Sequence, residues 1–111
     1  MIARQQFLAF DLGAESGRAM AAAFDGRRLS IEEVLRFPNG PVRVPLAGVR
    51  PGMPAEAIYW DVLGLWREMK QGGRQFVQRH GVPAGIGVDT WGVDYALLGR
   101  DGALLDRKSV V

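Results

Sequence analysis

The residue types best suited to chemistry gather at residues 11–18 (DLGAESGR). The apolar run that leads into this stretch is too short for a buried helix and is followed by Gly13, so a buried strand ending on Asp11 is expected. A carboxylate at a strand end can hold a magnesium ion, and a glycine-framed turn can point backbone N–H groups at an anion. The stretch predicts a phosphate and metal corner, with an ordinary turn and a solvated Asp11 as an equally weighted alternative.

A second short apolar strand is expected at residues 85–89, and it also ends on a carboxylate, Asp89. The helix expected between the two strands would make a right-handed crossover and leave them parallel. If they are neighbours in the sheet, Asp11 and Asp89 lie close together at the same edge.

The elements that position these carboxylates open with three antiparallel strands, at about residues 6–12, 17–25 and 28–37. Asp25 and Gly26 between apolar runs are a strong hairpin signal, and the residues after them alternate apolar and polar side chains. The alanine-rich run before this turn has helical propensity, but it is only seven residues long, which argues against a Rossmann helix.

The rest of the chain is expected to hold a loop or lid, a helix and further short strands. Residues 38–58 contain five of the six prolines, which lack the N–H that a sheet ladder needs, so a loop is predicted there, either functional or a passive excursion. A helix is predicted at about 61–79, with Asp61 as its N-cap. A strand at about 93–98 and the start of another at 103–105 follow the strand that ends on Asp89.

The predicted helix should turn one apolar stripe toward the sheet. The members of this stripe are Val62, Trp66, Met69, Gly73, Phe76 and Val77. Close approach to the sheet would offset the low helical propensity of Gly73. Gly72 lies off the stripe, so no packing gain is expected to offset its low helical propensity. Trp60 and Trp66 are expected in the core rather than on a sugar platform, and His80 is expected in solvent at the negative end of the helix dipole.

Composition narrows the class of protein. The 111 residues form one domain at most, carry a formal charge of +2 and include no cysteine, so disulfides and thiolate metal sites are excluded. Basic residues are scattered, which demands neither nucleic acid nor an anionic membrane as a partner. With no signal peptide or membrane-spanning stretch recognised, a soluble, cytoplasmic protein is expected.

Two motifs carry a resemblance to a known family. Residues 11–18 resemble the amino-terminal phosphate-binding motif of the FGGY carbohydrate kinases, and residues 87–95 (GVDTWGVDY) are similar to the matching motif of the rhamnulokinase branch. Asn39-Gly40 and Trp60-Asp61 fit that branch too. The resemblance runs from about residue 7 to residue 105, and the two motifs are specific in combination.

The resemblance implies an α/β chain with the ribonuclease H-like (actin-like ATPase) fold. Such kinases have two domains and are several times longer, so residues 1–111 would be a partial amino-terminal domain, with the second domain absent. The implied activity is ATP- and Mg²⁺-dependent phosphorylation of a ketose, L-rhamnulose, in rhamnose catabolism. The catalytic aspartate of these kinases comes later in the chain, so the fragment alone is predicted to be inactive.

The resemblance assigns roles only to residues that match the motifs. Its ATP-binding residues are Asp11, which is also the metal ligand, Gly13, Ala14, Glu15, Ser16, Gly17 and Arg18. Sugar contact is implied for Gly92, where a glycine lets a hydroxyl approach the backbone, and for Trp91, which could instead cover the domain. Glu15 departs from the small or hydroxyl residue usual at its position, and Arg18 could reach phosphate, face solvent or pair with Glu15.

Two other classes of function stay open. A ribonuclease H-like nuclease would use Asp11 and Asp89 with two metal ions, but it needs further carboxylates and a basic track. A non-catalytic actin-like module, or an inactive remnant, is the other alternative. For the kinase the expected partners are a nucleotide and a small sugar, with self-association through an exposed sheet edge as a hazard.

Overall fold

The computed structural model describes residues 4–92 and 94–105, which fall into two compact units. The first unit comprises residues 4–39 and 62–91. The second comprises residues 40–61, 92 and 94–105. The candidate chemistry of residues 11–18 and Asp89 lies in the first unit.

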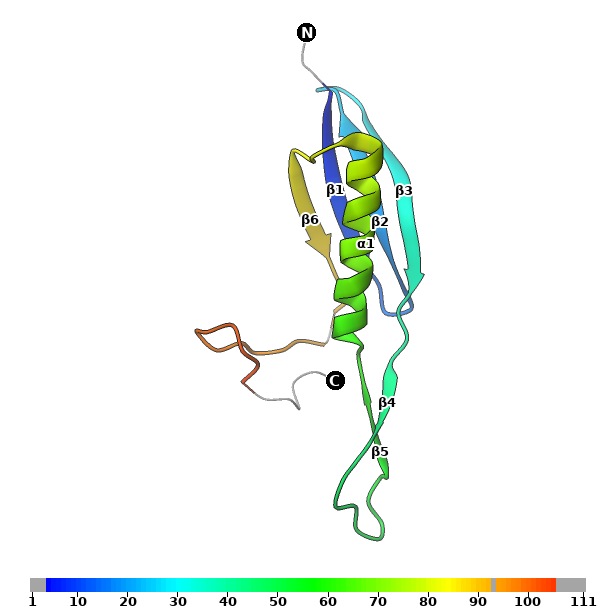
Figure 1. The fold of residues 1–111 in the computed structure, drawn as a ribbon, viewed down its shortest axis with the longest axis vertical. Coiled ribbons are helices and arrows are strands. Elements are labelled where there is room, and N and C mark those ends of the chain that lie inside the picture. Colours follow the sequence, from blue (N-terminus) through cyan, green and yellow to red (C-terminus); the bar gives the residue numbers. More distant parts are fainter. Residues whose placement is uncertain (1–3, 93, 106–111) are drawn as a thin grey trace. The chain divides into compact units, whose positions relative to one another are not determined.

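The described part of the first unit is a four-stranded mixed sheet with one helix packed on it (Figure 1). Its strands are β1 (Gln5–Leu12), β2 (Ser16–Phe24), β3 (Leu29–Pro38) and β6 (Gly85–Asp89), in the order β3-β2-β1-β6. The pairs β1–β2 and β2–β3 are antiparallel, and β1–β6 is parallel. The three-strand meander and the parallel crossover strand thus occur where the sequence predicts them.

The hairpin signal at Asp25 acts as expected. Gly26 has a φ of 96°, and the Asp25 carboxylate accepts hydrogen bonds from the backbone N–H groups of Arg27 and Arg28 at 2.8 and 2.7 Å. These bonds, that of Arg28 foremost, lower the pKa of Asp25 because they stabilise the ionised carboxylate. A short polar turn is therefore enough to join the two long strands.

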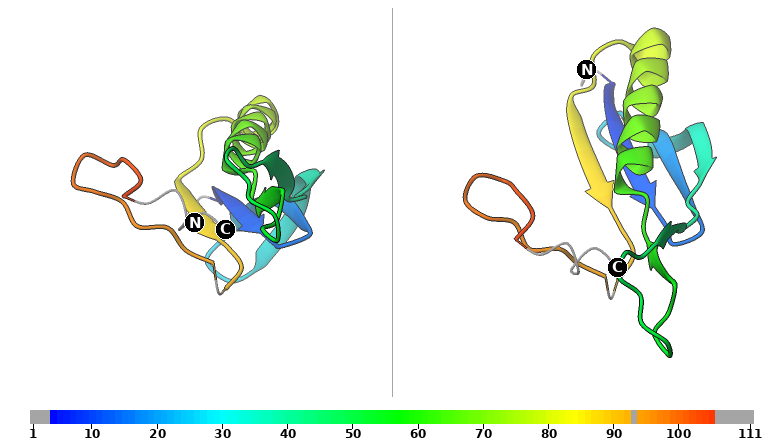
Figure 2. Two further views of the ribbon diagram at one scale, coloured as in Figure 1. Left: turned by 90° about the horizontal axis from the view of Figure 1, so that it is seen from below. Right: turned by 60° about the horizontal axis from the view of Figure 1, so that its bottom comes forward.

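The helix α1 (Val62–His80) packs against β1, β2 and β3 on one face of the sheet, as Figure 2 shows. Strand alternation sends every second side chain of β1 toward the helix, which buries Leu8, Phe10 and Leu12. The rest of the core cluster is Ala19, Ala21, Val34, Phe37, Leu65 and Phe76. Its centre is Phe76, whose side chain is fully buried.

The predicted helix stripe is confirmed at Phe76 and at Met69, which packs against the core, but it is wrong at its other members. The helix residues in the core are Leu65, Gly72 and Phe76, whereas Trp66 is 56% exposed. A Cβ at Gly72 would lie 2.6 Å from the Ala19 Cβ, while one at Gly73 would be 4.0 Å from its nearest neighbour in Leu8. Gly72, not Gly73, therefore lets the helix approach the sheet, and Trp66 is not a core residue.

The prediction that His80 is solvated is also wrong. Its ring packs against Phe76, with 5.1 Å between centroids, and its side chain is only 18% exposed. The Nε2 atom lies 3.9 Å from a carboxylate oxygen of Glu32 on β3. The last turn of α1 thus folds its histidine against the sheet.

In the second unit, the segment predicted as a loop at 38–58 forms a two-stranded antiparallel ribbon. Its strands are β4 (Val42–Pro45) and β5 (Glu56–Tyr59), with Val42 opposite Tyr59. Pro41 and Pro45 stand just before and at the end of β4, where a missing N–H costs least. The prolines thus bound a strand that the loop prediction overlooked.

The strand predicted at 93–98 is wrong for the residues described there. Val93 lies outside the described residues, and residues 94–98 contain no strand, only an isolated bridge between Leu98 and Leu104. The start of a strand at 103–105 is likewise reduced to this bridge. An apolar run needs a neighbouring strand to become one, and none is described beside it.

At the level of class, the expected α/β fold is confirmed by the mixed sheet and its helix. The finer ribonuclease H-like assignment stays a prediction. No helix within the described residues has the length and apolarity needed to cross a membrane.

Candidate functional site

The candidate site begins at the carboxyl ends of the parallel strands β1 and β6. The register pairs Asp11 directly with Asp89, so the two carboxylates end neighbouring strands at the same edge of the sheet. The crossover rule predicts that the two strands are parallel, and the structure shows that they are also neighbours, which the prediction set as its condition. The carboxyl edge of parallel strands is where open α/β sheets place their ligands.

Arg18 joins this edge from the adjacent strand. Its position on β2 is directly opposite Asp11, and its guanidinium donates to the Asp11 Oδ2 at 2.8 Å and to the Ser16 Oγ at 3.0 Å. The ion pair is partly open to solvent, with 26% of the Arg18 and 49% of the Asp11 side chain exposed. Arg18 thus pairs with Asp11 rather than with Glu15, and it does not point freely into solvent.

The turn between Asp11 and Arg18 is shaped by close contacts at its two glycines. The Gly13 N–H donates to the Ser16 carbonyl at 2.9 Å, and a Cβ at Gly13 would lie 2.8 Å from that oxygen. At Gly17 a Cβ would collide with the ring of Phe37. Neither glycine has φ in the left-handed region. Both are therefore required by close packing rather than by a left-handed backbone.

Between the glycines, the turn faces solvent. Ala14 and Glu15 are exposed, so the Glu15 carboxylate is turned outward and need not oppose an anion bound at the backbone. Ser16 is half-buried, with its hydroxyl held by Arg18.

Asn39 completes the site, although the sequence predicts no role for it there. It directly follows β3 and is 5% exposed, which makes it the one buried polar residue in the described part of the chain. Its side-chain Nδ2 donates to the Gly13 carbonyl at 2.8 Å, and its backbone N–H donates to the Glu15 carbonyl at 2.9 Å. The only sequence signal for Asn39 is its place in the Asn39-Gly40 pair of the resemblance.

The donor set at this edge suits a metal that is shared with a ligand. Within the described residues there is no group of three or more His, Cys, Asp or Glu side chains that could hold a metal ion. Mg²⁺ is usually bound through one or two carboxylates together with water and substrate phosphates. Asp11 and Asp89 fit that pattern, provided that Arg18 yields or shares the Asp11 carboxylate.

The two residues expected at the sugar lie in different surroundings. Trp91 is half-buried and packs against the core cluster of the first unit, so it covers the domain. Gly92, in the second unit, is exposed, and a Cβ there would meet no described atom within 4 Å. Open space beside Gly92 is compatible with close approach of a ligand.

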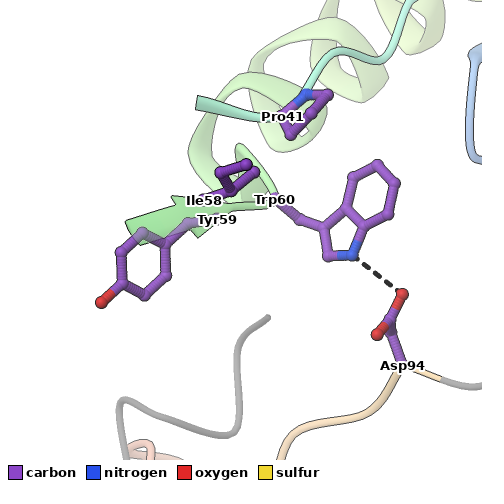
Figure 3. Close-up of a pocket in the computed structure, with 5 residues that line it drawn as sticks. All are labelled: Pro41, Ile58, Tyr59, Trp60 and Asp94. Atoms are coloured by element: carbon purple, nitrogen blue, oxygen red, sulfur yellow. Dashed lines mark hydrogen bonds between the residues drawn. The ribbon is translucent and has the colours of Figure 1, made fainter. Parts of the chain in front are cut away.

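The second unit also contains a small pocket, shown in Figure 3. It encloses about 270 Å³ and is lined by Pro41, Ile58, Tyr59, Trp60 and Asp94. The Trp60 Nε1 donates to the Asp94 Oδ2 at 2.9 Å, while Tyr59 points the other way from the end of β5. This hydrogen bond links the β4–β5 ribbon to residues after Gly92.

Comparison with known proteins points to the sugar kinases. The rhamnulokinase of Bacteroides thetaiotaomicron is 41% identical over 102 residues, which are 92% of this chain and 19% of that protein. Rhamnulokinases of Enterococcus faecalis and Pectobacterium atrosepticum are each 36% identical, over 96% and 91% of this chain. No protein-family model matches the chain.

The chain is therefore related to the rhamnulokinases over about nine-tenths of its residues, and this confirms the predicted resemblance. It spans about a fifth of the length of these curated relatives.

Proposed function

We propose that the chain supplies the ATP-phosphate corner and part of the sugar site of a rhamnulokinase-like kinase that phosphorylates L-rhamnulose. The observation that carries this proposal is the parallel register of Asp11 and Asp89, beside a closed turn between β1 and β2. The similarity to proteins named rhamnulokinase supports it. The cytoplasm, expected from the cysteine-free composition, is part of the same proposal.

The side chains of the corner have separable tasks. Bound Mg²⁺ would neutralise charge on the phosphates, and Asp11 would hold it directly or through water. Arg18 and Ser16 lie within hydrogen-bond distance of each other at the mouth of the turn, where both can donate to phosphate oxygens. Residues 13–17 would contribute backbone N–H groups, which bind anions without adding charge.

Gly92 and Trp91 would form this chain's part of the sugar-binding site. The exposed backbone at Gly92 can take a sugar hydroxyl at close range, because no side chain stands in the way. Trp91 would support that segment from its half-buried position against the core.

Phosphoryl transfer also needs a base for the sugar hydroxyl and a closed, water-free cleft. We assign no residue of this chain to the base. The proposal is therefore a binding half-site, and no useful turnover is expected from the 111-residue chain alone.

Calorimetric titration of the purified chain with Mg-ATP tests this function. Saturable binding is expected, with a loss of about tenfold or more in Asp11→Ala, since a charged group contributes on the order of 1.5–3 kcal/mol through its bonds. Glu33→Ala is the matched control, because it removes a carboxylate paired with Arg36 elsewhere on the sheet. A well-folded chain that gives no heat with Mg-ATP would reject the half-site and favour an inactive remnant.

The nuclease alternative is less well supported than the kinase. It requires a cluster of carboxylates around two metal ions, and the described residues bring only Asp11 and Asp89 together at this edge.

A further inference from the structure

Asn39 stands out because it is buried and polar, and because its side-chain amide and its backbone N–H both donate to the same turn. Its two donors reach the carbonyls of Gly13 and Glu15, which lie at least 24 positions earlier in the chain. Both bonds have lengths typical of strong N–H···O interactions. Asn39 therefore ties the end of β3 to the turn that joins β1 and β2.

This tie fixes the direction of backbone N–H groups as well as carbonyls. In a planar trans peptide the C=O and the following N–H point in opposite directions, and no cis peptide bond occurs in the described residues. Holding the Gly13 carbonyl toward Asn39 turns the Ala14 N–H away from it. Holding the Glu15 carbonyl does the same to the peptide before Ser16.

The Gly13 N–H closes the turn from inside through its bond to the Ser16 carbonyl. With Asn39 holding two carbonyls from outside, the turn has little freedom to rotate its peptides. An anion site made of backbone N–H groups depends on such fixed directions, since each peptide that flips presents an oxygen to the anion instead.

We propose that Asn39 is the positioning residue of the phosphate turn: it sets the orientation of the 13–16 backbone on which binding of the ATP phosphates depends. The inference rests on the proposed function and deepens it. Asn39 itself touches the turn and not the nucleotide.

The chain offers a direct spectroscopic readout, because Asn39 is its only asparagine. Selective ¹⁵N-asparagine labelling gives one backbone signal and one side-chain amide pair, which are the two donors in question. Slow hydrogen exchange at both is expected in the free chain. Addition of Mg-ATP, or of magnesium with inorganic triphosphate, should shift both signals saturably. Both ligands should have this effect because the phosphates, and not the adenine ring, would contact the turn.

The substitution Asn39→Asp is the sharpest variant, because the ionised carboxylate has the same shape but cannot donate to the Gly13 carbonyl. At pH 7 it should weaken Mg-ATP binding about tenfold or more. Val34→Ala is the control, because it removes buried apolar volume from β3, the strand that Asn39 follows, without changing a contact of the turn. This variant should bind Mg-ATP within about twofold of the unchanged protein.

The outcomes separate the two proposals. If the unchanged chain binds Mg-ATP but the Asn39 signals stay in place, or Asn39→Asp binds equally well, the positioning role is rejected and the proposed function survives. If the folded chain binds neither Mg-ATP nor triphosphate, the proposed function fails and the inference falls with it. The labelled spectrum of the unchanged chain decides the matter even if Asn39→Asp does not fold.

Discussion

At the scale of single residues, Arg18 determines how the corner would accept a ligand. Its ion pair with Asp11 is partly exposed, so it stabilises the fold by no more than about 1 kcal/mol. Separating the pair therefore costs little free energy, and a phosphate bound nearby would replace the lost partner of the guanidinium. Its Nε is buried and has no hydrogen-bond partner among the described residues, so the bonds to Asp11 and Ser16 come from the two terminal nitrogens.

Gly92 gives a residue-scale prediction that separates ligand contact from folding. Its φ is not left-handed and no described atom lies within 4 Å of an added Cβ, so Gly92→Ala should change the free energy of unfolding by less than about 0.5 kcal/mol. If a sugar hydroxyl approaches the backbone there, the same methyl group should abolish L-rhamnulose binding. Urea unfolding and calorimetry measure the two effects, and equal sugar affinity in both proteins would remove Gly92 from the site.

Asp25 predicts a pH dependence of stability. Its folded-state pKa is depressed by the Arg28 and Arg27 amides, so its contribution is present above the unfolded pKa, near 3.9, and is lost as the pH falls through the folded value. Asp25→Asn keeps an acceptor but does not titrate. The melting temperature of the unchanged chain should exceed that of the variant at pH 6, and the difference should shrink below about pH 4. A constant difference over that range would contradict the prediction.

At the scale of elements, α1 shows which parts of the fold the sequence can predict. Its predicted bounds agree with the structure to within one residue, but its buried face was predicted only in part, at Phe76 and Met69. Gly72 carries no hydrophobic signal, and it is the Ala19 methyl group on β2 that requires a glycine there. The β4–β5 ribbon was missed for a related reason: proline density marks a loop unless the prolines fall at strand ends. The local pattern of residue types predicts where a helix lies, but the residues it packs against decide which of its faces is buried.

The glycine pair of α1 tests that account. Gly72→Ala should destabilise the chain by about 1–3 kcal/mol, because the added methyl group overlaps Ala19 and the overlap outweighs the gain in helical propensity. Gly73→Ala, one position along, has room and should be neutral or stabilising by up to about 1 kcal/mol. Urea unfolding of both variants measures the difference. If the two substitutions changed the free energy of unfolding by the same amount and in the same direction, the helix would not be packed closely against β2 at Gly72.

At the scale of the whole molecule, the candidate site was only partly predictable. The parallel direction of β1 and β6 follows from the crossover rule, whereas their being neighbours, which places Asp11 opposite Asp89, was a condition that only the structure meets. The hydrogen bonds of Asn39 could not be predicted. They join Asn39 to backbone carbonyls of a distant turn, and backbone groups are the same in every residue type, so the sequence carries no signal for such bonds. The partner of Arg18 was equally open, since register across β1 and β2 decides it.

The last prediction concerns self-association of the chain through its edge strand β6. The chain spans about a fifth of the curated rhamnulokinases, and β6 is an edge strand whose Ile86 and Val88 are 64% and 56% exposed. Apolar edge strands associate through their free backbone groups, so we expect self-association that rises with concentration in sedimentation velocity. Ile86→Lys should reduce it, because a charge on the edge disfavours pairing. Leu63→Lys is the matched control, since Leu63 is more exposed, at 82%, but lies on α1. Equal effects of the two substitutions would show that general hydrophobicity, and not the β6 edge, drives association.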